Sequence, residues 1–226
     1  MIDSRGAYPA GRAAALSGVP LSTVHHWART ELLVPSVSPE RVKLWSYPDL
    51  MALRIVYWLR HTKKAPDGGS VPRTTMSSVK RALEQLSDLD LVLWTADAGP
   101  AVQVDRGGKI VVKSQPDAEV AHGQRVLDVG DDDLLDVLAP FSAEEGPRGP
   151  DLFSPRPKLR IVPGKLSGSP HVAHTRLESQ AVGSLADSGL GMATIYELYP
   201  DVEHEAIDEA IDLERQLARN LRPIAA

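Results

Sequence analysis

The chain has 226 residues, an apolar content of 42% and no cysteine, so we expect a folded protein without disulfides, thiolate zinc sites or cysteine nucleophiles. Its net charge of −5 conceals an asymmetry, because residues 1–81 carry 12 Lys and Arg against 5 Asp and Glu, whereas residues 82–226 carry 13 against 25. A basic amino-terminal third on an acidic body predicts that one end of the protein binds a polyanion. No apolar run approaches a membrane span and the first residues do not form a signal peptide, which predicts a cytoplasmic protein with no membrane partner.

Two short helices are predicted near the amino terminus. Residues 8–18 favour a helix with an alanine-rich apolar side that ends at Gly18, and residues 19–33 favour a second helix opened by Pro20. Two helices joined by so tight a turn form the helix-turn-helix pattern. The next segment, 34–45, has two prolines and several β-branched residues, so we expect an extended wing there rather than a helix.

The middle of the chain mixes helices with a hairpin. Residues 46–64 predict a long helix that opens with a Ser and an Asp at the spacing of a capping box, and residues 74–89 predict another helix. Within 101–113, an Asp-Arg-Gly-Gly turn between two β-branched runs indicates a β-hairpin. Residues 131–141 predict a short helix, because three acids in its first turn would suit the helix dipole.

The last part of the chain divides into an irregular segment and a helical unit. Residues 142–165 are rich in Pro and Gly and locally basic, which indicates a domain boundary or an extended arm. Residues 168–177 are expected to be extended. Three helices are then predicted, over 178–191, 192–200 and 201–220.

These elements predict a mainly α fold with a small β part (α+β). The predicted organisation is a winged helix-turn-helix in 1–66, a helix plus β-hairpin middle region in 67–145, a Pro/Gly-rich basic arm or linker in 146–167, and a trihelical domain in 168–226.

Within the first of these domains, one family pattern is present at moderately specific spacing. It is carried by Tyr8, an alanine helix, Gly18-Val19-Pro20, Thr23 to Trp27, Thr30-Glu31-Leu32-Leu33, Lys43 to Ser46 and Asp49-Leu50. On these residues, the segment 8–59 resembles the winged helix-turn-helix of MerR-type regulators, which implies DNA binding. Three departures from the family pattern, at Pro20, His25 and Lys43, imply a different base preference. The long dimerising coiled coil and the cysteine effector sites of many such regulators are absent.

The residue types agree with a DNA-reading role. Short polar and basic side chains on the second helix are candidates for base contacts, namely Ser22, Thr23, His26 and Arg29, with His25 where the family has an Arg. Candidates for phosphate contacts are Arg12 on the first helix and Arg41 and Lys43 on the wing. The alternative is that these charges form an ordinary solvated face. Trp27 and Trp45 are expected to anchor the core.

Two histidines, His171 and His174, raise the question of a metal site. Pro170 disfavours a helix at this point, and on a strand two side chains three apart face opposite ways. The only further histidine nearby in sequence is His204. We therefore expect no metal here.

A second family pattern explains these histidines better. Residues 168–215 keep it at Gly168, Pro170, Thr175, Arg176, Gly189, Ile195, Tyr199, Pro200, Ala206 and Ala210. This segment resembles a small trihelical domain associated with VapB-type antitoxins. Residues 171–226 carry 4 Lys and Arg against 10 Asp and Glu, which favours contacts with protein over contacts with DNA. For Arg176, a buried ion pair and a partner contact both remain open.

Together the two resemblances imply the antitoxin of a type II toxin–antitoxin module. The implied partners are a VapC-like ribonuclease with a PIN fold and a magnesium site, and the operator DNA of the protein's own operon, bound by a homodimer or a higher hetero-oligomer. One hypothesis for inhibition is that the basic arm, through Arg156, Lys158 or Arg160, enters the acidic pocket of the toxin. The alternative is that these residues belong to a solvated linker.

Two other classes of function compete with the antitoxin. A stand-alone regulator would sense a small ligand through residues 70–145. An enzyme is disfavoured, because the sequence has no nucleophile elbow, phosphate loop, metal triad or dinucleotide fingerprint. The carboxylate run Asp131-Asp132-Asp133 is expected to serve a helix dipole. The sequence thus predicts neither catalytic residues nor a cofactor.

Overall fold

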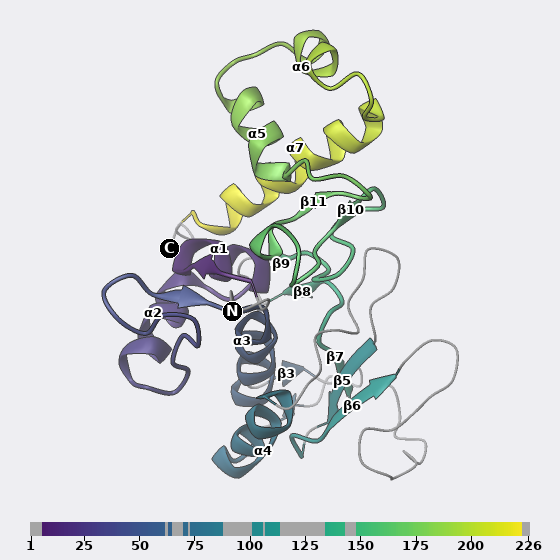
Figure 1. Cartoon of the computed structure of the whole chain (residues 1–226). Helices are drawn as coiled ribbons and strands as arrows, with labels where there is room; N and C mark the ends of the chain where they lie inside the picture. Colours follow the sequence, from purple (N-terminus) through teal and green to yellow (C-terminus); the bar gives the residue numbers. More distant parts are fainter. Residues whose placement is uncertain are drawn as a thin grey trace.

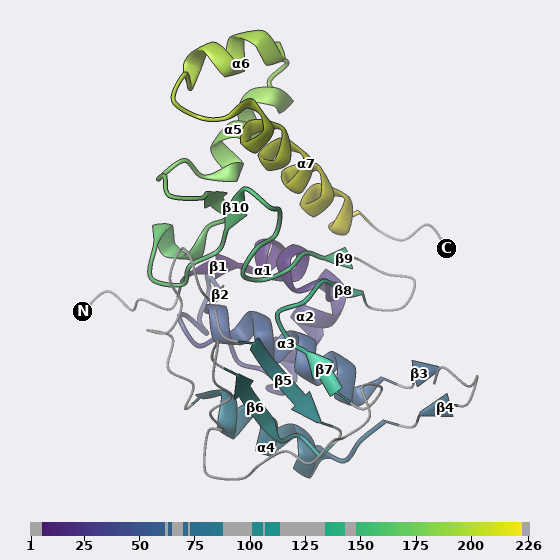
Figure 2. The same ribbon diagram turned by 90° about the vertical axis from the view of Figure 1, so that its right-hand side faces the viewer.

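The computed structural model describes residues 6–61, 63–64, 70–71, 73–87, 101–105, 107–113, 134–142 and 148–222. The elements stack in three tiers (Figures 1 and 2). The middle tier holds α1 (Ala10–Ser17), α2 (Leu21–Arg29) and α3 (Tyr47–Arg60), the lower tier α4 (Met76–Ser87) and a small sheet, and the upper tier α5 (Ser179–Asp187), α6 (Met192–Leu198) and α7 (His204–Asn220). The sheets have two or three strands, all antiparallel. The prediction of a mainly α fold with a small β part is confirmed.

Helices α1 and α2 are joined by a three-residue turn. Helix α1 ends because Gly18 adopts a left-handed conformation with φ of 72°, which an L side chain rarely takes, and its amide donates to the carbonyl of Ala14. Pro20 precedes the first residue of α2, where its fixed φ suits a helix start. The two predicted helices and the tight turn between them are confirmed.

The wing, residues 34–45, is held against the start of the chain by strand pairing. Strand β1 (Tyr8–Pro9) pairs antiparallel with β2 (Leu44–Trp45), and an isolated bridge joins Ser38 to Leu44. The segment is extended or bent rather than helical, as predicted. Trp45 and Trp27 are both buried in the core, also as predicted.

Helix α3 crosses the middle tier and begins with the predicted capping box. The Ser46 hydroxyl accepts from the amide of Asp49, and the Asp49 carboxylate accepts from the amide of Ser46. Nearly the whole helix is buried, and one of its buried residues is an arginine, Arg54. This side chain joins the middle tier to its neighbours.

Arg54 is completely buried, and its recorded acceptors in the described part of the chain are all backbone carbonyls. Its Nε donates to Ser17 at 3.0 Å, and its terminal nitrogens donate to the carbonyls of Leu16, Val137, Leu138, Ala139 and Pro150. Burial lowers the pKa of Arg54 to about 10, partly offset by Tyr47, Asp151 and Asp136. The guanidinium therefore stays charged at neutral pH, and it ties the end of α1 to two segments more than 80 residues away.

The lower tier combines α4 with the sheet of order β6-β5-β7, formed by β5 (Ala101–Asp105), β6 (Ile110–Lys113) and β7 (Leu134–Asp136). The predicted hairpin is confirmed as β5 and β6. The helix predicted over 131–141 is wrong, because residues 134–136 pair with β5 and the amide of Val137 donates to Val102. Residues 131–133 lie outside the described residues. A short hairpin of β3 (Lys63–Lys64) and β4 (Ser70–Val71) leads into α4.

The segment predicted as an arm or linker is part of the folded body, so that prediction is wrong for residues 148–167. Strand β9 (Arg148–Gly149) pairs with β8 (Phe141–Ser142), and β10 (Leu159–Arg160) pairs with β11 (His171–Val172). Leu152, Leu159 and Ile161 are fully buried. A 3-10 turn, Leu166–Gly168, links β10 to β11 and accepts from the Tyr8 hydroxyl through the Gly168 carbonyl at 2.8 Å. The burial of apolar side chains here outweighs the Pro and Gly content that suggested a linker.

The upper tier contains the three predicted helices. Helices α5 and α7 pack closely, and both contribute buried apolar side chains, among them Val182 of α5 and Ala210 and Leu213 of α7. Helix α7 then continues over α1, so the upper and middle tiers share one hydrophobic core (Figure 2). Among the helices that the structure describes, none combines the length and apolar character needed to cross a membrane.

The contact between β9 and the end of α1 leaves no room for a side chain. A Cβ on Gly149 would lie 2.7 Å from both the Gly18 amide nitrogen and the Leu16 carbonyl oxygen. We therefore expect Gly149→Ala to lower the free energy of unfolding by about 2 kcal/mol through overpacking. The matched variant Gly11→Ala, whose Cβ meets only Leu221 at 3.8 Å, is expected to leave stability unchanged or raise it by up to about 1 kcal/mol. Urea denaturation of both variants is the measurement, and equal midpoints would refute the packing argument.

Candidate nucleic-acid interface

The outer face of α2 gathers the polar residues that the sequence singled out. Ser22, His25, His26 and Arg29 are all exposed, and their spacing of 3, 4 and 7 residues places them on one side of the helix. The opposite side buries Val24, Trp27 and Ala28, and Thr23 lies half-buried at the edge. The sequence produces this division because apolar and polar residues of α2 alternate with the helical period.

The core holds this face in a fixed position. The Trp27 ring lies 6.3 Å from the Tyr57 ring of α3, centroid to centroid, at a tilted angle. Helix α2 has no acidic residue in its first turn, and His26 and Arg29 stand in its last turn, where a positive charge suits the helix dipole. The face therefore offers hydrogen-bond donors and a cation, with no carboxylate on the helix itself.

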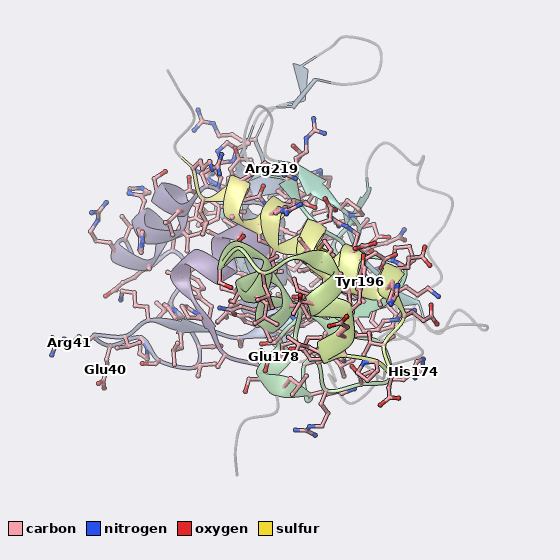
Figure 3. The ribbon with its side chains drawn as sticks, turned by 90° about the horizontal axis from the view of Figure 1, so that it is seen from above. Glu40, Arg41, His174, Glu178, Tyr196 and Arg219 are labelled. Atoms are coloured by element: carbon pink, nitrogen blue, oxygen red, sulfur yellow. The ribbon has the colours of Figure 1, made fainter. Side chains whose placement is uncertain are left out.

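The wing contributes one fully exposed cation. Arg41 is exposed, and Figure 3 shows it beside Glu40 at the outer end of the wing. Lys43 is half-buried and donates to the carbonyl of Pro39 at 2.9 Å, which closes the wing turn. Of the two wing residues predicted to contact phosphate, Arg41 is thus the more accessible.

Arg12 does not fit its predicted role as a phosphate contact. Both of its terminal nitrogens donate to the Glu214 carboxylate of α7, at 2.6 and 2.8 Å, and the side chain is only 17% exposed. In a bidentate ion pair the carboxylate neutralises the guanidinium and accepts hydrogen bonds from both of its terminal nitrogens. Glu214 also accepts from the Ser179 hydroxyl of α5. This prediction is therefore corrected: Arg12 fastens α1 to the upper tier.

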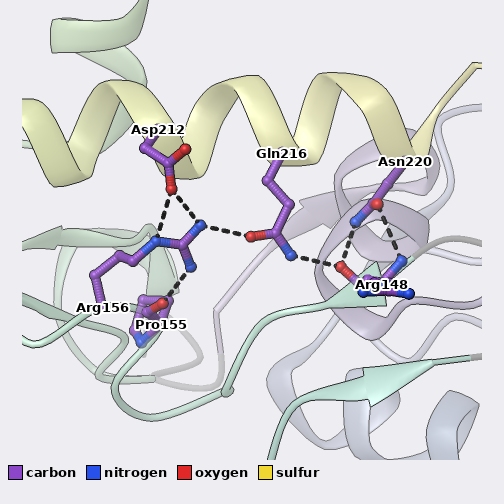
Figure 4. Close-up of polar contacts among 6 residues, drawn as sticks. All are labelled: Arg148, Pro155, Arg156, Asp212, Gln216 and Asn220. Carbon is purple, nitrogen blue, oxygen red and sulfur yellow. Dashed lines mark hydrogen bonds and ion pairs between the residues drawn. The ribbon is translucent and has the colours of Figure 1, made fainter.

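Two of the basic residues predicted to enter the toxin, Arg156 and Lys158, instead bind side chains at α7, and Figure 4 shows this for Arg156. Arg156 donates to Asp212 through Nε at 3.0 Å and a terminal nitrogen at 2.8 Å, and to Gln216 at 2.6 Å. Lys158 lies 2.6 Å from Glu203, whose hydrogen bond and charge raise the pKa of the lysine. The structure contradicts the free-arm hypothesis, because an arginine that entered a partner would first have to break these contacts.

The other two predicted toxin contacts differ from each other. Arg160 donates to the Ser154 hydroxyl and to the carbonyls of Pro157 and Leu159, and its guanidinium lies over the Phe153 ring at 5.7 Å. Arg176 is exposed, so the buried ion pair considered for it is wrong. Its alternative role as a partner contact stays a prediction.

The two histidines lie in different environments. His171 is completely buried in β11, with Nδ1 2.9 Å from the Ser169 carbonyl and Nε2 without a hydrogen-bond partner. His174 is exposed and adopts a left-handed conformation with φ of 59°. Among the residues that the structure describes, no three His, Asp or Glu side chains gather as metal ligands would.

The burial of His171 predicts acid sensitivity of the upper tier. Burial, aided by the charge of Lys165, lowers the pKa of His171 below its ordinary value of 6.5. The unfolded chain then binds a proton that the folded chain resists, so stability falls as the pH drops below about 6.5, by up to about 1.4 kcal/mol per pH unit. Denaturation of the wild type and His171→Phe at pH 7.5 and 5.5 is the measurement, with His174→Ala as the control. The same pH dependence in His171→Phe as in the wild type would refute this assignment.

Sequence reasoning missed the groups on α7 that receive these contacts. Asp212, Gln216 and Asn220 form a row at intervals of four residues, and Gln216 and Asn220 hold the Arg148 backbone at 2.7 to 3.0 Å (Figure 4). Polar residues at intervals of four, beside an apolar stripe of the same helix, could have predicted that the helix has a second contact face.

In comparison with known proteins, a family match is found for the carboxyl-terminal part of the chain alone. Residues 160–212 match the family model described as Protein of unknown function (DUF433). The match runs from β10 to within α7 and begins inside the segment predicted as an arm, in agreement with the pairing of β10 and β11. No curated protein and no solved structure matches the chain.

Proposed function

We propose that the protein is the antitoxin of a type II toxin–antitoxin module, which represses its own operon through the helix-turn-helix and neutralises a VapC-like PIN-fold ribonuclease. The observation that carries the proposal is the outer face of α2, where Ser22, His25, His26 and Arg29 stand exposed together on one face of a helix anchored in the core. This face suits the edges of bases in a major groove.

In this proposal α2 supplies base contacts and the wing supplies phosphate contacts. Arg29 is suited to guanine, because a guanidinium can donate two parallel hydrogen bonds to its major-groove edge. Arg41 is exposed at the end of the wing, where it would neutralise a phosphate. Two copies of the chain would bind the two halves of a palindromic operator.

The ribonuclease would bind the upper tier. The DUF433 match covers this tier, and its excess of acidic residues suits an enzyme whose surface must attract RNA. Arg156 and Lys158 already bind acidic residues of this chain, Asp212 and Glu203. This favours inhibition of the ribonuclease through the surface of the upper tier rather than through an inserted arm. DNA and toxin would then be bound at the same time, since α2 lies in the middle tier and the toxin would bind the upper tier (Figure 1).

The test is co-expression with the neighbouring reading frame, with a tag on one partner, followed by size exclusion and light scattering. We expect a stable complex in which the partner's ribonuclease activity is suppressed, and which shifts the DNA upstream of the operon. A lone dimer that still shifts this DNA would leave a repressor and overturn the antitoxin assignment.

A cavity favours the stand-alone regulator as a second candidate. It has a volume of about 470 Å³ and lies at the edge of the middle region, between Phe141, Asp151 and the docked Arg156. A small polar ligand there would contact both β8 and α7. This candidate predicts that a metabolite fraction from the cell changes the affinity of the lone protein for its upstream DNA, which an antitoxin does not require.

A further inference from the structure

Helix α6 is ordered but largely uncovered. Of its seven residues only Ile195 is buried. The side chain of Leu198 at its end is 53% exposed, and that of Leu190 just before it is 36% exposed. Large aliphatic side chains exposed at the same short helix indicate a surface that is covered in a complex.

Contacts with α7 hold α6 in place without covering it. The Tyr196 ring stacks on His204 with centroids 3.9 Å apart, and its hydroxyl donates to Asp208 at 2.7 Å. A helix of seven residues has little stability of its own, so these contacts and Ile195 fix its position. A pre-formed surface loses little conformational entropy when it binds.

The charge around α6 is of one sign. Residues 177–214 contain ten Asp and Glu and no Lys or Arg. Several of these acids are engaged by the chain itself, as Glu214 is by Arg12 and Asp212 is by Arg156. Asp187 at the end of α5, Glu197 in α6 and Asp201 after α6 are exposed, and among the described residues the structure records no ion pair for them. Residues 187–201 therefore expose two leucines together with three acids, which we call the acidic rim.

We propose that the α6 surface, defined as Leu190 and Leu198 with Asp187, Glu197 and Asp201, docks the basic RNA-binding face of the partner ribonuclease. This inference rests on the proposed function and names the surface that performs it. A ribonuclease has to present Lys and Arg near its active site to hold phosphates, and the acidic rim matches that charge while Leu198 fills the desolvated centre. The same rim repels DNA, RNA and anionic lipid, so a basic protein surface is the occupant that the charges favour.

The test uses the full chain and the product of the neighbouring reading frame, with affinity measured by biolayer interferometry at 50 and 200 mM salt. We expect Leu198→Asp and Glu197→Lys each to weaken binding at least tenfold and to restore ribonuclease activity in proportion. Glu197→Lys should also reduce the loss of affinity between the two salt concentrations, because the rim then attracts the partner less. Since both residues are exposed, both variants are expected to keep the wild-type melting temperature.

The matched controls lie on α4, at the opposite end of the molecule from α6 (Figure 1). Met76→Asp changes an apolar side chain that is 38% exposed, and Glu84→Lys reverses an exposed charge. Both are expected to bind within twofold of the wild type. A wild-type complex that Leu198→Asp and Glu197→Lys leave unchanged would overturn the inference and preserve the proposed function. A wild-type chain that does not bind the ribonuclease would overturn both.

Discussion

Replacement of Arg54 by methionine is expected to lower the free energy of unfolding by about 4 kcal/mol, near the upper end for a single substitution. The variant retains an unbranched chain about as long as the aliphatic stem of arginine but removes every donor to six backbone carbonyls, which come from the end of α1, from residues 137–139 and from Pro150. Buried acceptors left without a donor carry the full cost of their lost hydration. Because these carbonyls belong to three separate segments, the loss also frees the middle tier from its neighbours.

Two further variants separate the role of the charge from the role of the donors. Arg54→Lys keeps the charge but offers three donors in place of five, so we expect a loss of about half the size. Arg60→Met changes an arginine of the same helix for which the described residues provide one hydrogen bond, 3.3 Å to the Thr74 carbonyl, and is expected to cost less than about 1 kcal/mol. Urea denaturation followed by tryptophan fluorescence gives all three values. Similar losses for Arg54→Met and Arg60→Met would show that the carbonyl contacts contribute little.

The elements that could be predicted from the sequence are those with local signals. Gly18 ends α1, the Ser46–Asp49 capping box begins α3, and the Asp-Arg-Gly-Gly turn joins β5 to β6, each within a few residues of chain. The predictions that were wrong concern segments whose structure depends on partners far away in the sequence. Residues 134–136 became a strand because β5 offers its edge to them, which outweighs the helical preference of an acidic and leucine-rich segment.

The candidate site divides in the same way. The exposed face of α2 follows from the helical period of its own residues, so Ser22, His26 and Arg29 could be placed together before the structure was known. Arg12 could not be assigned, because its partner Glu214 lies 202 residues further along the chain. The sequence shows which side chains are cations, but only the fold shows whether a carboxylate of the same chain already pairs with one of them.

Substitution of Arg29 by alanine is expected to weaken binding to the upstream DNA of the operon by roughly 10- to 100-fold, the range for the loss of a base contact worth about 1–3 kcal/mol. Arg29 is exposed at the end of the outer face of α2 and takes no part in the core, so the folded stability should not change. Arg41→Ala is expected to weaken binding to any DNA sequence alike. It should also lower the dependence of log K on log salt by about 0.9, as the loss of one phosphate contact requires.

The control is a second exposed arginine that lies outside the proposed interface. Arg219 lies on α7, well apart from the wing in Figure 3, and Arg219→Ala is expected to bind DNA like the wild type. Fluorescence anisotropy with the upstream fragment and with an unrelated fragment, at three salt concentrations, separates loss of specificity from loss of charge. If Arg29→Ala binds the upstream fragment as tightly as the wild type and Arg219→Ala do, α2 does not read the operator. If both variants weaken binding to both fragments by the same factor, the effect is one of net charge alone, because the loss of a base contact would affect the upstream fragment more than the unrelated one.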